Sequence, residues 1–104
     1  MMETEIFKAL ADPTRRAVFE KLADGGRNAT ELRAGLPISQ PAMSQHLGVL
    51  REAGLIREAR SGRTVTYTTN PEGLAPLRDW MLRYGAFWPA RLEALKQLLK
   101  EMDQ

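Results

Sequence analysis

Residues 39–56 read SQPAMSQHLGVLREAGLI, a stretch that begins with short amide and hydroxyl side chains. An ideal helix turns by about 100° per residue, so Met43, Leu47 and Leu50 share one face, which we expect to be buried. The opposite side contains no lysine, whereas solvated helix faces are usually richer in Lys and Glu. Gln can pair with adenine at two points, and Ser can bond to several bases in the major groove. The stretch therefore predicts a helix that contacts base edges in DNA.

The side chains expected on this outward side differ in what they can contact. Gln45 lies near its centre, with Gln40 and Ser44 on one shoulder, and all three are candidate base contacts. Gly48 would allow the helix axis to approach the groove closely. Phosphates would repel Glu52, so we expect that end of the helix to lie away from the DNA. The alternative is that these polar residues are simply tolerated on a surface.

His46 is the only histidine of the chain and lies at the edge of the buried side of this helix. Two roles are open: a hydrogen bond to a phosphate, or a half-buried ring that holds the turn together. Catalysis would need a nucleophile or an acid placed beside it, and the sequence suggests none, so we do not expect an enzyme. Arg15 and Arg16 have similar alternatives, since they either contact a DNA backbone or partner subunit or serve a structural purpose.

Apolar spacing and capping signals predict the elements that hold this helix in place. They give helices over residues 4–11, 12–25, 30–36, 39–54 and 71–102. Asp12, Thr30 and Ser39 are the expected N-caps, and Gly25 and Gly54 the expected stops.

Residues 55–70 change from a helical period to an alternation of about two residues on either side of Ser61-Gly62. This pattern predicts a β-hairpin. A short helix, the tight turn GLPIS and a longer helix form a helix-turn-helix, and the hairpin behind them forms a wing. The expected fold class is therefore mainly α with a small β-hairpin, a winged helix-turn-helix.

Basic residues concentrate in the middle of the chain. The net charge is only +2, but residues 27–63 carry six arginines against three glutamates, which suits a polyanionic partner. Arg57, Arg60 and Arg63 belong to the hairpin and are candidate phosphate or minor-groove contacts. The backbone amides that follow Thr30 would also point at a phosphate, and Ser39 begins the reading helix. Alternatively, the hairpin arginines only keep the turn soluble.

The last predicted helix carries more large apolar side chains than a body of this size can cover. Together with the first helix it predicts a subunit interface, since aromatic side chains are favoured there. The alternative is an internal core helix. The expected interface residues are Ile6, Phe7, Leu10, Trp80, Tyr84, Phe87, Trp88, Leu92, Leu95 and Leu99.

Residues 1–104 are expected to form a single domain, with a DNA-binding core over 12–70 and dimerisation helices over 1–11 and 71–104. Pro89 removes an amide donor and presses on the carbonyl of Gly85, which predicts a kink or break between these residues.

Composition excludes several classes. The chain has no cysteine, which excludes disulfides, thiolate metal sites and thiol redox chemistry. We identify neither a signal peptide nor a membrane-spanning run, and expect a cytoplasmic protein without a cofactor.

Four segments together resemble the ArsR-like family of bacterial winged-helix repressors: ALADPTRRAVFEKL, TELRAGLPISQPAMSQHLGVLREAGLI, SGRTVTY and WMLRYGAFWPARLEAL. They cover nearly the whole chain, and SQHLGVLREAGLI is a specific signature. The chain looks most like the metal-independent, autorepressor-type subgroup, which ends in a Trp- and Tyr-rich helix. The resemblance implies a homodimer that binds an inverted-repeat operator and blocks transcription. It also implies that His46 lies near the DNA backbone.

The metal sensors of that family use cysteines in the helix before the recognition helix, or Asp, His and Glu in the last helix. Here ELRAGL contains no cysteine and the last helix no histidine, so we do not expect a metal sensor. The releasing signal is open: a small molecule at the aromatic interface, capture by a sequestering protein, or autorepression without a ligand. The rival function is a winged-helix protein-interaction module that binds no DNA.

Overall fold

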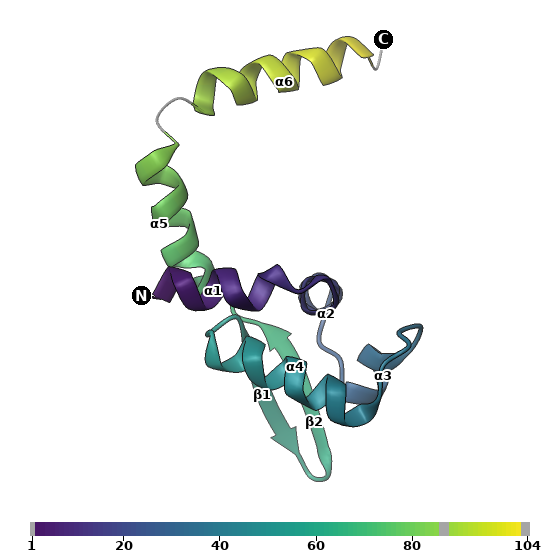
Figure 1. Cartoon of the computed structure of the whole chain (residues 1–104). Helices are drawn as coiled ribbons and strands as arrows, with labels where there is room; N and C mark the ends of the chain where they lie inside the picture. Colours follow the sequence, from purple (N-terminus) through teal and green to yellow (C-terminus); the bar gives the residue numbers. More distant parts are fainter. Residues whose placement is uncertain (1, 86–87, 103–104) are drawn as a thin grey trace.

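The structure is a computed structural model that describes residues 2–85 and 88–102, except for the side chains of residues 2, 88–92 and 95. Its elements follow one another as α1 (Met2–Ala11), α2 (Pro13–Ala23), α3 (Ala29–Arg33), α4 (Gln40–Glu52), β1 (Ile56–Ser61), β2 (Thr64–Thr69), the 3-10 helix η1 (Pro71–Leu74), α5 (Ala75–Tyr84) and α6 (Trp88–Met102). Mainly helical structure with one antiparallel hairpin confirms the expected fold class (Figure 1). Among the described residues, no helix is long and apolar enough to cross a bilayer.

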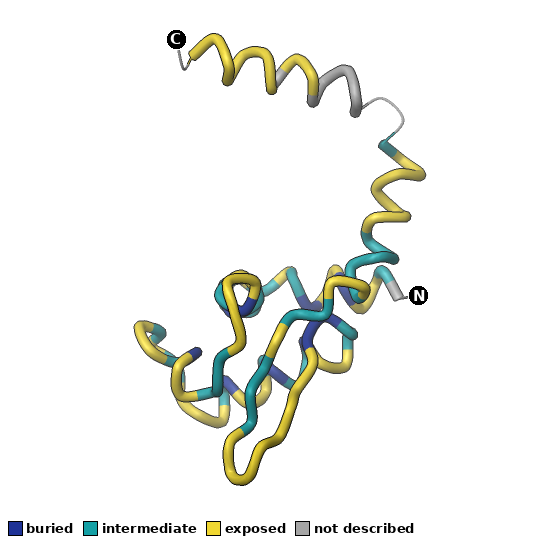
Figure 2. The backbone as a smooth tube through the Cα atoms, turned by 180° about the vertical axis from the view of Figure 1, so that it is seen from behind, coloured by how far each residue is buried: buried dark blue, intermediate teal, exposed yellow. Residues whose placement is uncertain are grey.

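The core lies where α1, α2 and α4 meet the base of the hairpin (Figure 2). Burial of a leucine-sized side chain contributes about 1.5–3 kcal/mol, so this cluster is what fixes α4 on the body. The prediction for the inward face of α4 is confirmed. The buried apolar side chains of the described residues are Ile6, Ala9, Val18, Leu22, Leu32, Met43, Leu47, Leu50, Leu55 and Ile56.

Local capping sets the ends of the helices. The carboxylate of Asp12 accepts the N–H of Arg15 at 2.9 Å, and the hydroxyl of Ser39 accepts the N–H of Ala42 at 3.2 Å. Both N-caps were expected. α4 ends at Glu52, and Gly54 follows with φ of 79°, the left-handed conformation that commonly ends a helix.

The expectation for the N-cap of α3 is wrong. Asn28, not Thr30, caps this helix: the side chain of Asn28 accepts the N–H of Glu31 at 2.8 Å, and Glu31 accepts the N–H of Asn28 at 2.9 Å. This reciprocal capping box satisfies two backbone donors, which a cap two residues later could not do. The helix also ends at Arg33 and does not reach Leu36.

The hairpin turn lies one residue later than expected. Ser61 pairs with Thr64, so the turn residues are Gly62 and Arg63. Gly62 has φ of 61°, as the first position of a tight II′-type turn requires. At the other end, Arg27 and Tyr67 exchange backbone hydrogen bonds of 3.0 and 2.8 Å, which tie the hairpin to the loop after α2. Half-buried Tyr67 also packs on the core and so anchors the wing to the body.

Two helices separated by a break follow the hairpin, as the positions of Gly85 and Pro89 predicted. Gly85 is the C-cap of α5, and Pro89 lies in the first turn of α6, where a missing amide donor costs little. α5 lies beside α1, where the rings of Phe7 and Trp80 meet edge-on with 5.2 Å between centroids. α6 extends away from the body (Figures 1 and 2).

Candidate nucleic-acid interface

The side of α4 that faces away from the core carries the predicted base contacts. Gln40, Ser44 and Gln45 are all exposed, as is Glu52 at the far end of the helix. Gly48 lies between them, and an added Cβ there would meet no atom within 4 Å, so the backbone is open on this side. Such a surface can enter a major groove, where an α-helix fits.

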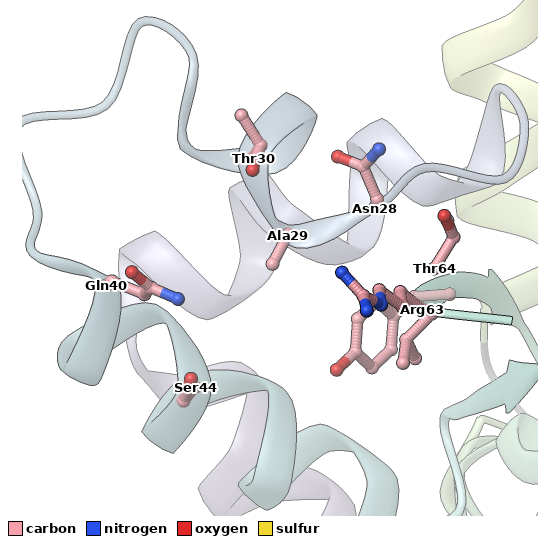
Figure 3. A pocket seen from close by; sticks show the side chains of 9 residues that line it. Asn28, Ala29, Thr30, Gln40, Ser44, Arg63 and Thr64 are labelled. Atoms are coloured by element: carbon pink, nitrogen blue, oxygen red, sulfur yellow. The ribbon is translucent and has the colours of Figure 1, made fainter. Parts of the chain in front are cut away.

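A polar cavity of about 430 Å³ lies between α3, the start of α4 and the wing (Figure 3). Its polar groups are amides, hydroxyls and one guanidinium, and it has no acidic side chain. Figure 3 places Gln40 and Ser44 on one side and Arg63 on the other, with Thr30 and Asn28 on the α3 side. The lining residues are Asn28, Ala29, Thr30, Gln40, Ser44, Arg63, Thr64, Val65 and Tyr67.

Asn28 and Thr64 were not among the sequence-predicted site residues. The spacing of Asn28 and Glu31 is a capping-box signature and could have placed Asn28 at the start of α3. Thr64 carries no comparable signal, because its position depends on which residues form the hairpin turn. Gln45, in contrast, does not line this cavity. Of the three predicted base contacts, Gln40 and Ser44 therefore line the cavity beside the wing, and Gln45 does not.

The six arginines of the basic stretch divide into two groups. Arg27 and Arg33 donate to backbone carbonyls, and Arg51 forms an ion pair with Glu58 at 3.3 Å. These three stabilise the fold. In the part of the chain that the structure describes, the other three have exposed side chains without a hydrogen-bond or ion-pair partner, and they all belong to the wing: Arg57, Arg60 and Arg63. Unpaired guanidinium groups on a hairpin are suited to phosphate contacts.

His46 is half-buried, and its Nδ1 lies 3.3 Å from Nη1 of Arg15. The structure thus gives this ring an internal partner, and a contact of His46 with DNA stays a prediction. Arg16 donates to the carbonyls of Leu10 and Ala11 at 2.6 and 3.1 Å, so it caps the end of α1. Both arginines therefore have partners within the chain, which favours the structural alternative, and a contact of either with DNA or a partner subunit stays a prediction.

Comparison with known proteins agrees with this geometry. Residues 10–59 match the family model of a helix-turn-helix domain. The HTH-type transcriptional regulator Rv2034 of Mycobacterium tuberculosis is 44% identical over 93 residues, which span 89% of this chain and 84% of that protein. The transcriptional repressor SdpR of Bacillus subtilis is 35% identical over 79 residues, or 76% of this chain and 88% of that repressor.

Two solved structures of transcriptional regulators have a similar fold. An ArsR-like transcriptional regulator from Rhodococcus sp. RHA1 has a TM-score of 0.73 and 32% identity, over 93% of this chain and 92% of that one. The crystal structure of an ArsR family transcriptional regulator has a TM-score of 0.78 and 31% identity, over 86% and 98%. The chain belongs to the ArsR-like family of winged helix-turn-helix regulators. It is a DNA-binding transcriptional repressor and not an enzyme.

This ArsR-like chain also has an exposed apolar surface outside the winged helix-turn-helix. Of the predicted interface residues, Phe7, Trp80, Tyr84 and Leu99 are exposed. Further large apolar side chains extend this surface, among them Leu82 at 70% and Met102 at 72% exposure. Leu82 and Leu98 were not among the predicted interface residues, because Leu82 lies off the apolar stripe of α5 and Leu98 only at the edge of that of α6.

Some predicted interface residues are placed elsewhere. Ile6 is 1% exposed and belongs to the core, so its assignment to a subunit interface is wrong: it faces inward from α1 into the buried cluster. Leu10 is half-buried and packs against the same cluster. Phe87 and the side chains of Trp88, Leu92 and Leu95 lie outside the described residues.

Proposed function

We propose that this repressor is a homodimer that blocks transcription by occupying an inverted-repeat operator. The observation that supports this proposal best is the polar cavity, because Gln40 and Ser44 of α4 line it on one side and Arg63 of the wing on the other. Base-reading and phosphate-binding groups are thereby presented together. Direct readout needs both kinds of contact, since phosphate contacts fix the register in which side chains meet the bases.

The roles follow from position. Gln45 reads base edges from the centre of the exposed side of α4, and Gln40 and Ser44 contact bases or phosphates near the wing. Arg63 binds a phosphate next to the reading helix, while Arg57 and Arg60 follow the backbone along the hairpin. Thr30, which lines the cavity, and Ser39, the N-cap of α4, donate their hydroxyl protons to phosphates. Residues 12–70 form the DNA-binding core in this proposal.

A second copy covers the apolar surface of α1, α5 and α6. Trp80 contacts both Phe7 and Tyr84 at centroid distances of 5.2 Å and forms a continuous aromatic patch across α1 and α5. Exposed aromatic side chains of this kind are enriched at subunit interfaces. The two reading helices of such a dimer enter successive major grooves about 34 Å apart on one face of the duplex.

Metal sensing is not part of this function. The chain has no cysteine, and its only histidine is hydrogen-bonded to an arginine, so transition-metal ligands are scarce. A small molecule bound at the aromatic patch, or a sequestering protein, would release the DNA through the proposed dimer. Autorepression without a ligand would act through the same dimer.

Selection of duplexes from a random-sequence pool by the purified protein tests the proposal. We expect enrichment of an inverted repeat whose half-sites lie one helical turn apart, protected from nuclease over both halves. The Gln45→Ala variant should lose preference at particular base pairs while still binding DNA. A protein-interaction module predicts the opposite: no enriched sequence and little salt-sensitive affinity.

A further inference from the structure

The guanidinium of Arg15 links the end of α1 to the reading helix. Its Nε donates to the carbonyl of Ala9 at 2.7 Å, and its Nη2 donates to that of Lys8 at 3.1 Å. Its Nη1 lies 3.3 Å from Nδ1 of His46 on α4. The last carbonyls of a helix have no partner within the helix, so Arg15 supplies what α1 lacks and at the same time contacts α4.

This contact defines the protonation of the ring. A guanidinium has donors only, so Nδ1 of His46 must accept, and a nitrogen that accepts carries no proton. The ring is then neutral, with its proton on Nε2. Protonation of Nδ1 would place two donors and two positive charges face to face and break the link.

The charged groups around the ring come from α2 and its N-cap. Arg15 is the hydrogen-bond partner, and the nearby carboxylate of Asp12 is held by the N–H of Arg15 at 2.9 Å. α1 contributes backbone carbonyls through Arg15. Among the described residues, α3 and β1 bring no hydrogen-bonding or ion-pairing side chain to the ring.

We infer that Arg15 is a positioning residue for DNA binding, which fixes the reading helix relative to α1 through the neutral ring of His46. This inference rests on the proposed function, because α1 also contacts α5 through Phe7 and Trp80 and so belongs to the dimerisation surface. The placement of that surface is thereby transmitted to the side chains that read bases. The link makes DNA affinity depend on pH, with the neutral ring as the binding-competent state.

The direction of this dependence separates the link from a simple phosphate contact. A histidine that only contacts a phosphate binds more tightly when it gains a proton. A histidine that accepts from Arg15 loses its partner on protonation, so affinity falls as the pH is lowered. His46 is the only histidine of the chain, so no second histidine contributes to this dependence.

The first test needs no DNA. Long-range nitrogen–proton NMR spectra of the protein at about pH 8 report which ring nitrogen is protonated, and a single histidine makes the assignment unambiguous. We expect the proton on Nε2 in the wild-type protein. A proton on Nδ1 would overturn the inference, whether or not an operator has been found.

The second test uses the duplex selected above and two matched variants. His46→Asn places an acceptor oxygen near the position of Nδ1 and does not titrate, whereas His46→Gln places its polar end near Nε2. We expect His46→Asn, which keeps the acceptor for Arg15, to retain more affinity than His46→Gln and to lose the pH dependence. His46→Gln and Arg15→Gln should each weaken binding about fivefold or more, with no further loss in the double variant.

Melting temperatures, measured in parallel, identify any variant that fails to fold, and the wild-type pH profile provides the readout in that case. Wild-type affinity that rises on acidification would contradict the inference, as would a fully active His46→Gln beside a weakened His46→Asn. If no duplex is enriched, the proposed function fails, while the NMR measurement still tests the link.

Discussion

Arg63 in the wing turn and Gln40 at the start of α4 line the same cavity, although they belong to different elements (Figure 3). The turn of the hairpin carries the guanidinium toward the reading helix, so a phosphate bound by Arg63 would lie beside the bases that α4 contacts. Arg60 belongs to β1, before the turn, and does not line this cavity. Arg60 and Arg63 are therefore expected to contact different parts of the DNA backbone.

Replacing Arg63 by alanine should weaken binding to all sequences alike, because a phosphate contact carries no sequence information. The slope of log affinity against log salt concentration should fall by about one unit. Titrations of selected and random duplexes at several salt concentrations measure both effects. Arg78→Ala is the control: it removes the same charge from α5, where Arg78 is paired with Asp79 at 3.1 Å. An unchanged salt slope for Arg63→Ala would remove this residue from the phosphate contacts.

The Gln45→Ala variant should lose about 1–3 kcal/mol of discrimination at particular base pairs. Competition between the selected duplex and its single base-pair variants locates these positions. Glu52→Ala is the matched control at the far end of the same exposed side, and base preference should be unchanged in it. Equal losses on selected and random DNA would exclude Gln45 from the base-reading residues.

A charge placed in the apolar surface should separate the proposed dimer. Leu99 of α6 is 53% exposed, and Leu99→Glu would put a carboxylate where a second copy is expected to pack. Sedimentation velocity should show the wild-type protein as a dimer and this variant mostly as a monomer, with weaker binding to the inverted repeat. Gln97→Glu is the control: it adds the same charge at a nearby exposed polar position and should still sediment as a dimer. A wild-type protein that sediments as a monomer would contradict the homodimer itself.

The N-cap of α2 should make stability fall in acid. The N–H of Arg15, helped by the positive charge of the Arg15 guanidinium, lowers the pKa of Asp12 below its ordinary value of 3.8. A carboxyl group whose pKa is lowered by folding contributes stability above its unfolded value and loses it as the pH falls through the folded value. Urea denaturation from about pH 5 to about pH 2 should therefore show a smaller loss for Asp12→Ser, which keeps a cap but has no carboxyl group. Identical losses in both proteins would show that the Asp12 carboxylate does not contribute.

Much of the fold could be predicted because its signals are local. The spacing of Met43, Leu47 and Leu50 identified the buried face of α4, and Gly85 with Pro89 identified the break before α6. The residue type of Thr30 fits an N-cap, but Asn28 caps α3 because Glu31 completes a reciprocal capping box with it. The sequence pattern alone contained both possibilities.

The site was harder to predict, because its arrangement depends on contacts between distant segments. The excess of arginines was visible in the sequence. Which of them have partners within the fold, and which stay unpaired on the wing, depends on contacts such as that of Arg51 with Glu58 of β1. Ile6 had the same apolar character as Phe7 and Leu10, and only the packing of α1 decided that it faces the core. His46 left two alternatives open, and its contact with Arg15, a residue distant in the sequence, is an internal partner that the pattern could not show.

Symmetric reading of one duplex by two copies is tested most directly by changing the spacing of the half-sites. The affinity and stoichiometry of the protein are measured on the selected inverted repeat, and again after insertion of about half a helical turn or about one full turn between the halves. We predict two copies per duplex, a loss of affinity with the half-turn insertion, and partial recovery with the full turn. One copy per duplex, or an affinity that ignores the spacing, would contradict a dimer whose two reading helices lie on one face of the DNA.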